Sequence, residues 1–300
     1  MLSTEDRIIH KSVLVDEVLK YLEPKPGKTY VDVTFGSGGH TRAILEHEPE
    51  ARVIALDWDS ISFDTYAPAF KEEFGDRLTL IWGNFALLYK LLAKAGIKKV
   101  DGVLADFGTS QMQIKERPGF SVYNDLPLDM RMSPPHQKIT AAELLNKASE
   151  EKLREIFWQL GEERFARQIV QAIVAERKKK RFQTTGQLAA VIERAVPMPK
   201  KRTIHPATRV FQALRIYVNK ELENIRSFLS GATRALNPDG RLVCISFHSL
   251  EDRLVKQFFK EQESLDILRI LTSKVVTASP EELAVNPSSR SARLRAAERI

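Results

Sequence analysis

The sequence is poor in cysteine. Its 300 residues include one, Cys244, so the chain can form neither an internal disulfide framework nor a metal site built from several cysteines. We therefore expect no bound metal. A single free thiol is also compatible with a reducing compartment, and we expect a cytoplasmic protein.

Long apolar runs are missing as well. No stretch approaches the roughly 18 consecutive apolar residues that a membrane-spanning helix requires. Met1–Arg7 carries acidic side chains where a secretory signal would place basic ones. We expect a soluble protein with no membrane partner. Hydrophobic residues make up 43% of the chain and charged residues 28%, which is typical of a globular fold.

Positive charge is concentrated in one part of the chain. The net charge is +7, but Glu151–Arg215 alone holds 15 Lys/Arg against 6 Asp/Glu, so the remaining residues are slightly acidic together. This asymmetry indicates a near-neutral body joined to an element that binds a polyanion. A well-solvated helical surface is the alternative interpretation.

Short apolar runs alternate with helical patterns in the first third of the chain. The expected strands are Thr29–Val33, Arg52–Asp57, Arg77–Trp82 and Val100–Asp106. The expected helices are Thr41–Leu45, one running to Phe74 with Ser60 as its cap, and Ala86–Ala95. Such alternation predicts an α/β fold with a parallel, doubly wound sheet.

The alternation breaks after Asp106 and resumes later. A loop-like segment, 108–135, precedes several helices between Thr140 and Val196, and a basic loop follows. Helices to about Leu236, a turn at Asn237–Gly240, a strand Arg241–Phe247, a helix Glu251–Lys260 and weaker strands Leu265–Leu271 and Arg293–Arg299 complete the pattern. We expect a core of residues 1–110 and 207–300 with a helical insertion, 111–206.

Three features terminate strands and are therefore candidates for a ligand site. In a parallel sheet, ligands bind beyond the carboxyl ends of the strands. The glycine-rich loop Gly36–His40 allows a tight turn and close approach of a ligand. Asp57 is placed to accept hydrogen bonds from ribose hydroxyls, and Asp106 ends the fourth strand. The combination predicts a nucleoside-containing cofactor.

The choice of cofactor depends on the glycine spacing. A dinucleotide-binding G-x-G-x-x-G motif counted from Gly36 requires a third glycine where the chain has Thr41. This argues against an NAD-dependent oxidoreductase. S-adenosylmethionine carries a sulfonium cation, which the carboxylates of Asp32 and Asp106 would favour electrostatically.

Several motifs together resemble a known family. They are His10-x-x-Val13-Leu14, Asp32-x-Thr34-x-Gly36-x-Gly38-Gly39-His40, Pro127–Met132, Gly161–Ala166, His205-Pro-Ala-Thr-Arg-x-Phe-Gln-Ala-x-Arg215, Ile245–Arg253 and Arg290-Ser-Ala-x-Leu-Arg-x-Ala-Glu298. Over essentially the whole chain, this series is similar to the bacterial 16S rRNA (cytosine-N4)-methyltransferase family, RsmH or MraW.

The resemblance implies a class I, Rossmann-like S-adenosylmethionine-dependent methyltransferase with a helical substrate-recognition insertion. Its implied reaction is methyl transfer to N4 of a cytidine in the decoding region of small-subunit rRNA. The cofactor contacts implied for this chain, with Phe85 beside the adenine and Asp57 on the ribose, are Gly38, Gly39, His40, Asp57, Phe85, Asp106 and Gln113.

Three positions depart from the family pattern. The loop after the fourth strand is Asp106-Phe-Gly-Thr-Ser-Gln111 in place of Asp-Leu-Gly-Val/Leu-Ser-Ser, Leu126 replaces a glycine, and Ser288 replaces an arginine. The first two changes fall in loops expected to shape the target site. They bear on target choice more than on cofactor binding.

Two residues are candidates for the chemistry. Cytosine N4 is a weak nucleophile, and an acceptor on its N–H would orient it and help to remove the proton. Asp106 is our first candidate, although it matches only the first position of the Asp/Asn/Ser-Pro-Pro-Tyr/Phe motif of DNA amino-methyltransferases. His248 is the second, with a structural role as its alternative. Phe247 could stack a target base or belong to the core.

Basic residues of the insertion and of the helix after it are candidates for RNA contacts. Arg177–Arg181 and Lys200–Arg202 are expected to attract the RNA backbone nonspecifically. The residues expected to contact phosphate or the cytidine edge are His205, Thr208, Arg209, Gln212 and Arg215.

The altered loop after Asp106 leaves a second hypothesis open, a non-catalytic ribosome-assembly factor with a methyltransferase fold. The sequence does not determine the oligomeric state.

Overall fold

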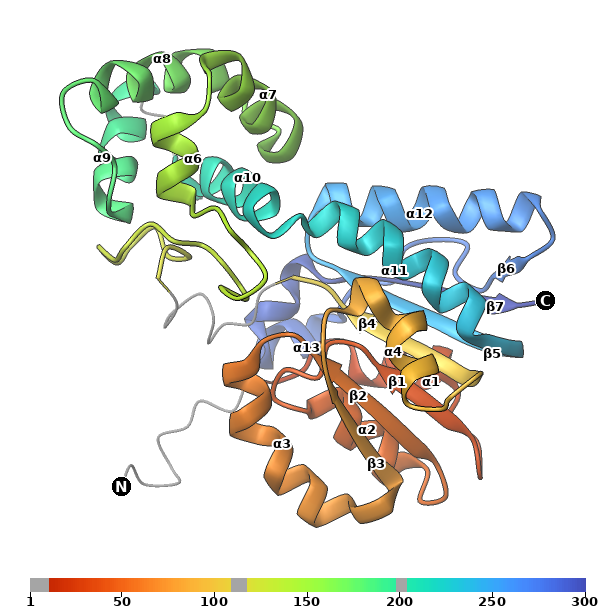
Figure 1. Ribbon diagram of the computed structural model, residues 1–300. Coiled ribbons are helices and arrows are strands. Elements are labelled where there is room, and N and C mark those ends of the chain that lie inside the picture. Colours follow the sequence, from red (N-terminus) through yellow and green to blue (C-terminus); the bar gives the residue numbers. More distant parts are fainter. Residues whose placement is uncertain (1–10, 109–117, 198–203) are drawn as a thin grey trace. The chain divides into compact units, whose positions relative to one another are not determined.

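A computed structural model of the chain describes residues 11–108, 118–197 and 204–300 (Figure 1). The chain forms two compact units. The core unit comprises Met1–Gly108 and Leu222–Ile300, and the helical unit comprises Thr109–Glu221. The helical unit includes all of the expected insertion and extends further, because helix α10 (Thr208–Asn219) packs against α7 (Glu150–Gly161).

The core unit is built on a sheet of seven strands in the order β3-β2-β1-β4-β5-β7-β6. The strands are β1 (Thr29–Asp32), β2 (Arg52–Asp57), β3 (Leu78–Trp82), β4 (Val100–Asp106), β5 (Leu236–Ser246), β6 (Leu268–Ile270) and β7 (Arg293–Arg299). The first five pair in parallel, whereas β7 is antiparallel to both β5 and β6. Strand order reverses between β1 and β4, so the doubly wound, Rossmann-like α/β sheet predicted from the sequence is confirmed.

Helices cover both faces of this sheet (Figure 1). Along β4, successive side chains point to opposite faces. Val103 packs in a cluster with Leu88 and Phe228, whereas Leu104 packs in a separate cluster with Ile44 and Phe70. The helices of the core unit are α1 (Val15–Leu22), α2 (Gly39–His47), α3 (Ser60–Phe74), α4 (Leu88–Lys94), α11 (Glu221–Ala235), α12 (Ser249–Ser264) and α13 (Pro280–Val285).

Two local predictions were wrong. Ser60 is not the cap of α3 but its first residue; the Asp59 side chain accepts the capping hydrogen bond from the Ile61 N–H. The turn expected at Asn237–Gly240 lies inside β5, where the pairing with β4 shifts register between Val100 and Gly102. Asp239 has a φ of 61° there, so the turn-forming residues produce an irregularity within the strand rather than its start.

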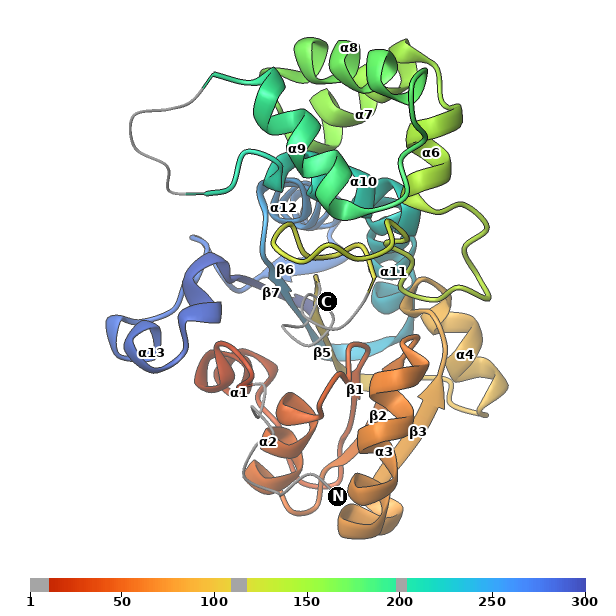
Figure 2. The same cartoon turned by 90° about the vertical axis from the view of Figure 1, so that its left-hand side faces the viewer.

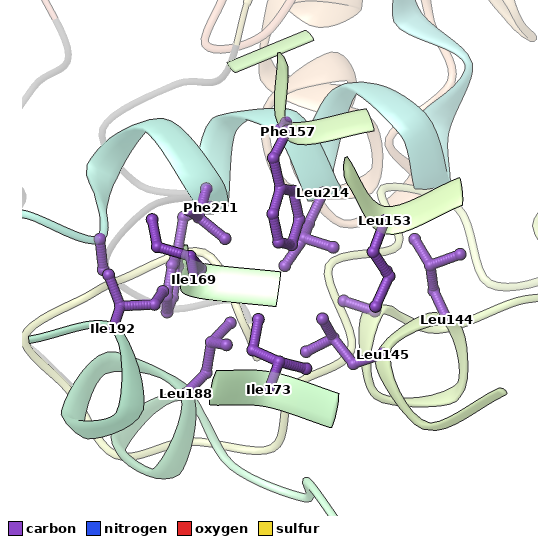
Figure 3. Packing of buried hydrophobic residues seen from close by; sticks show 14 of the residues in the cluster. Leu144, Leu145, Leu153, Phe157, Ile169, Ile173, Leu188, Ile192, Phe211 and Leu214 are labelled. Atoms are coloured by element: carbon purple, nitrogen blue, oxygen red, sulfur yellow. The ribbon is translucent and has the colours of Figure 1, made fainter. Parts of the chain in front are cut away.

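The helical unit contains five described helices around one apolar cluster (Figure 2). Besides α7 and α10 these are α6 (Ala141–Lys147), α8 (Ala166–Arg177) and α9 (Thr185–Ala195). Thr140 and Thr184 begin α6 and α9 with capping boxes, which satisfy backbone N–H groups that the helix itself leaves free. The cluster includes Phe157, Ile173 and Leu214 (Figure 3). The described residues of this unit form helices and no strand, as predicted.

The close packing of α7 on α10 depends on Gly161, the last residue of α7. A Cβ atom at this position would lie 2.6 Å from the carbonyl oxygen of Arg209. Among the residues that the structure describes, no helix is both long and apolar enough to cross a membrane.

Candidate active site

The predicted strand ends lie together at the carboxyl edge of the sheet, because β2, β1 and β4 are neighbours. Hydrogen bonds join them directly. The Gly36 N–H donates to Oδ2 of Asp57 at 2.7 Å, and the Asp106 N–H donates to Oγ1 of Thr34 at 2.7 Å. The loop after β1 is therefore tied to the ends of both adjacent strands.

The glycines of this loop are required by their surroundings. Gly36 and Gly38 have φ angles of 53° and 84°, a region that favours glycine. A Cβ atom on Gly38 would lie 2.3 Å from the Phe70 ring, and one on Gly39 would lie 2.1 Å from Oγ of Ser12. Larger residues at these positions would displace the loop, which explains the glycine-rich sequence at the start of α2.

Asp57 is oriented by the backbone. Its Oδ1 accepts the N–H of Asp59 at 2.9 Å, while its Oδ2 accepts the N–H of Gly36. Burial raises the pKa of Asp57 to about 7, against the lowering effect of these two hydrogen bonds, and the charges of Asp59 and Asp32 raise it further. Each carboxylate oxygen keeps a second lone pair, with which it can accept a hydrogen bond from a ribose hydroxyl.

Asp32 fixes both ends of the glycine-rich loop by hydrogen bonds. Its side chain is fully buried; Oδ1 accepts the Thr34 N–H at 3.1 Å and Oδ2 accepts the Thr41 hydroxyl at 2.8 Å. Burial raises the pKa of this carboxyl, which His40 and the hydrogen bonds lower. Thr41 occupies the position of the missing third glycine, and its hydroxyl fastens α2 to the end of β1.

Asp106 and His40 face each other across the edge. Nδ1 of His40 is 3.9 Å from Oδ2 of Asp106, and the side chains are 4% and 16% exposed. The other oxygen, Oδ1 of Asp106, is buried and has no hydrogen-bond partner among the described residues. Burial raises the pKa of Asp106 to about 7; His40 lowers it, whereas Asp32 and Glu251 raise it. This unpaired acceptor can take a hydrogen bond from an incoming N–H group.

The N-terminal segment contributes to the site, which the sequence analysis did not predict. His40 donates from Nε2 to the carbonyl oxygen of Val13 at 2.8 Å. The segment is held in turn by the C-terminal part of the core unit, since Glu282 accepts the Leu14 N–H at 2.8 Å and Asn286 donates to the Lys11 carbonyl at 3.1 Å. In the sequence, only the motif His10-x-x-Val13-Leu14 pointed to a role for this segment.

Of the two remaining residues expected to contact the cofactor, Phe85 and Gln113, the structure describes only Phe85. Phe85 lies just after β3, half-buried, with ring centroids of Phe107 and Phe228 at 5.9 and 5.7 Å. Because it follows β3, it lies at the same edge of the sheet. Gln113 lies outside the described residues.

His248 caps a helix. Its Nδ1 accepts the Glu251 N–H at 3.4 Å, the first hydrogen bond of a capping box at the start of α12. The preceding Phe247 is half-buried, and a Cβ atom added to Gly108 would lie 3.2 Å from its ring. Both residues follow β5 at the carboxyl edge of the sheet, as expected from the sequence.

The residues of α10 that are expected to contact RNA differ in their exposure and in the bonds that they make within the protein. Arg215 makes a bidentate salt bridge with Glu221, with both distances at 2.9 Å. Arg209 is exposed and donates to the Glu162 carbonyl at 3.1 Å. Thr208 and Gln212 are half-buried.

Other basic residues of the helical unit also contact neighbouring side chains or backbone carbonyls within the unit. His205 lies 3.3 Å from Glu193 and packs edge-on against Tyr123. Arg177 donates to the carbonyl oxygens of Leu145 and Ala148. Residues 178–181 are exposed, and Lys200–Arg202 lies outside the described residues.

Comparison with known proteins gives one consistent result. Residues 7–300 match the family model described as the MraW methylase family. The protein "Ribosomal RNA small subunit methyltransferase H" of Deinococcus deserti is 46% identical over 99% of this chain and 96% of its own length. Proteins of the same name from Endomicrobium trichonymphae and Thermomicrobium roseum are 48% and 47% identical, over 97% of this chain and 99% and 94% of their own lengths.

Proposed function

Because this chain belongs to the MraW methylase family, we propose that it transfers the methyl group of S-adenosylmethionine to N4 of a cytidine in the decoding region of 16S rRNA. The observation that supports this most directly is the carboxyl edge of the sheet. It combines a glycine loop, the carboxylate of Asp57 that accepts the Gly36 N–H, and the unpaired buried oxygen of Asp106.

The residues at this edge fit the cofactor. The carboxyls of Asp57 and Asp106 are buried near that of Asp32, whose charge raises the pKa of both. A sulfonium or ammonium cation bound here would relieve this repulsion. Gly36 and Gly38 allow the tight turn of the loop against which the cofactor would lie, while Asp57 would hold the ribose and Phe85 would lie against the adenine. When bound, S-adenosylmethionine supplies the electrophilic methyl group.

Asp106 is the proposed catalytic residue. The N4 lone pair of cytosine is delocalised into the ring, so the amine must be oriented for in-line attack. Oδ1 of Asp106 would accept one N4–H, and as the N–C bond forms and the S–C bond breaks, the carboxylate would take that proton. We assign His248 to the cap of α12, because its Nδ1 accepts the Glu251 N–H and its Nε2 lies 3.2 Å from Oε1 of the same residue.

The helical unit would hold the RNA. Its exposed cations, including Arg209 and residues 178–181, suit attraction of a phosphate backbone. Thr208 and Gln212 are the further RNA contacts that we propose on α10. His205 and Arg215 are engaged by Glu193 and Glu221, so we assign them to shaping this surface. The enzyme would act in the cytoplasm, where its ribosomal substrate is assembled.

Mass spectrometry of rRNA nucleosides tests the proposal. The protein is incubated with isotope-labelled S-adenosylmethionine and small subunits from a strain that lacks this methylation. We expect labelled N4-methylcytidine, formed much more slowly by Asp106→Asn and at the wild-type rate by the control Asp64→Asn, which alters an exposed residue of α3. Cofactor binding without any labelled nucleoside would contradict the proposal and support the assembly-factor hypothesis, which membership of a methylase family does not favour.

A further inference from the structure

One face of the helical unit carries an exposed aromatic ring among arginines. Trp158 on α7 is 62% exposed. It lines a surface hollow of about 370 Å³ together with three arginines and two glutamates, Arg154, Arg164, Arg167, Glu151 and Glu155. This volume is within the range of about 300–1,000 Å³ found for small-molecule sites.

The spacing of the sequence produces this arrangement. Arg154 and Trp158 are four residues apart on α7 and therefore lie on the same side of the helix. Arg164 follows the end of α7, and Arg167 lies in the first turn of α8, which packs against α7 (Figures 1 and 2). The neighbouring residues Leu153 and Phe157 point to another side of α7, which is buried in the core of the unit (Figure 3).

The arginines of the hollow are available to a ligand. Arg154, Arg164 and Arg167 are all exposed, and none makes a direct salt bridge within the described part of the chain. The guanidinium of Arg164 is held over the Phe165 ring, 4.7 Å from its centroid. Glu155, which also lines the hollow, forms a salt bridge with Lys152, whose Nζ lies 2.9 Å from Oε2 of Glu155. Packing of the unit explains neither the exposed indole nor the exposed guanidinium groups.

We propose that this hollow, which we call the Trp158 site, binds an unpaired base of the RNA substrate. The base would stack on the indole of Trp158, and its flanking phosphates would contact Arg154 and Arg167. Stacking on an aromatic ring beside cations is how proteins hold single-stranded nucleic acid, and the positive charge of Glu151–Arg215 matches a polyanion. The inference rests on the proposed RNA substrate and adds a contact on the helical unit.

Titration of the full-length protein with end-labelled oligoadenylate tests this site. We expect Trp158→Ala to weaken binding about tenfold, within the range of about 1–3 kcal/mol for one stacked base, and Trp158→Phe to retain most of the affinity. Arg167→Ala should make the salt dependence shallower by about one unit of slope. The control Arg226→Ala, at an exposed position of α11, should behave as wild type.

Inorganic polyphosphate, a polyanion without bases, separates stacking from charge. We expect Trp158→Ala to bind polyphosphate as wild type does. Equal affinity of wild type and Trp158→Ala for oligoadenylate would overturn the Trp158 site, as would an equal loss of affinity for both polyanions. Displacement of oligoadenylate by polyglutamate at equal charge concentration would also overturn it, in favour of an acidic protein partner.

The nucleoside assay is independent of these results. If Trp158→Ala binds oligoadenylate normally while wild type still forms N4-methylcytidine, the Trp158 site alone fails. If wild type binds no oligoadenylate and methylates no rRNA, both proposals fail. Thermal unfolding of each variant shows whether it is folded, and Trp158→Phe keeps the test valid if Trp158→Ala is not.

Discussion

Nδ1 of His40 lies 3.9 Å from Oδ2 of Asp106, while Nε2 of the same ring donates to the carbonyl of Val13. Since a carbonyl only accepts hydrogen bonds, the proton of a neutral His40 must be on Nε2. Its Nδ1 lone pair therefore faces the Asp106 carboxyl. In the proposed mechanism, Asp106 can accept a proton from a substrate amine only when its carboxyl is ionised.

The methyl-transfer rate should depend on pH through Asp106. Burial raises its pKa to about 7, with His40 opposing the shift, and only the ionised carboxylate can act as a base. We expect the single-turnover rate to fall by about tenfold per pH unit on the acid side of about 7 and to level off above it.

Saturating cofactor separates this effect from Asp57, whose pKa is also raised to about 7 and which would affect cofactor binding. The residual rate of Asp106→Asn should not vary with pH in this window. A wild-type rate that is independent of pH between 5 and 9 (roughly the range in which such groups titrate) would contradict the assignment of Asp106 as the base.

Asp106→Asn should stabilise the protein above pH 7. The pKa of Asp106 is raised from 3.8 in the unfolded chain to about 7 in the fold, so the protonated carboxyl favours folding, and this stability is lost as the pH rises through about 7. We expect the free energy of unfolding of Asp106→Asn to exceed that of wild type by about 1–3 kcal/mol at pH 8.

Denaturant unfolding at pH 8 and pH 4 measures this difference, which should almost vanish at the lower pH. A variant that loses activity but gains stability would show that Asp106 is retained for chemistry. A loss of stability at pH 8 would mean that the carboxylate holds the fold together.

Gly38→Ala should lower the free energy of unfolding by more than the positive φ of this residue alone explains. Gly38 has a φ of 84°, and a Cβ atom there would lie 2.3 Å from the Phe70 ring. Gly75→Ala is the matched control, because Gly75 has a φ of 54° and its Cβ atom would meet nothing within 4 Å.

We expect Gly75→Ala to lower the free energy of unfolding by about 1 kcal/mol, and Gly38→Ala to lower it by about 1–3 kcal/mol more. Calorimetry should show weaker cofactor binding for Gly38→Ala alone. Equal costs for the two variants would show that the loop can move away from Phe70 without penalty.

Arg209 and Arg215 should separate into binding and structural roles. Arg209 is exposed, so Arg209→Ala should make the salt dependence of RNA binding shallower by about one unit without lowering stability. Arg215 is 18% exposed and paired with Glu221, so Arg215→Ala should lower the free energy of unfolding by about 1–3 kcal/mol.

Filter binding at several salt concentrations and thermal unfolding of both variants check these outcomes. Should Arg215→Ala leave the melting temperature unchanged, the salt bridge with Glu221 would contribute nothing, and a direct RNA role for Arg215 would be favoured instead.

The sequence predicts the parts of the site that depend on local pattern. Asp57 and Asp106 end apolar runs, so their place at the edge of the sheet follows from the doubly wound topology alone. Strands Arg52–Asp57, Val100–Asp106 and Arg293–Arg299 have the predicted bounds.

The sequence fails where a contact joins distant segments. Arg177 looks like part of a solvated basic run, yet it donates to carbonyls at the end of α6, and Glu282 binds the Leu14 N–H across 268 positions. Such pairs leave no periodicity and no spacing motif. Trp158 differs: the helical spacing places it beside Arg154 on α7, but its position beside Arg164 and Arg167 in the hollow depends on how α8 packs against α7.

The order in which a ribosome produces this chain differs from the order in which its two units can be completed. The helical unit is continuous and has all of its residues once Glu221 has been added. The core unit needs β7, which inserts between β5 and β6, and it needs Glu282 to hold Leu14. During translation, the surface proposed to hold RNA can therefore fold while the methyl-transfer site is unfinished. The core is completed only by the strand Arg293–Arg299.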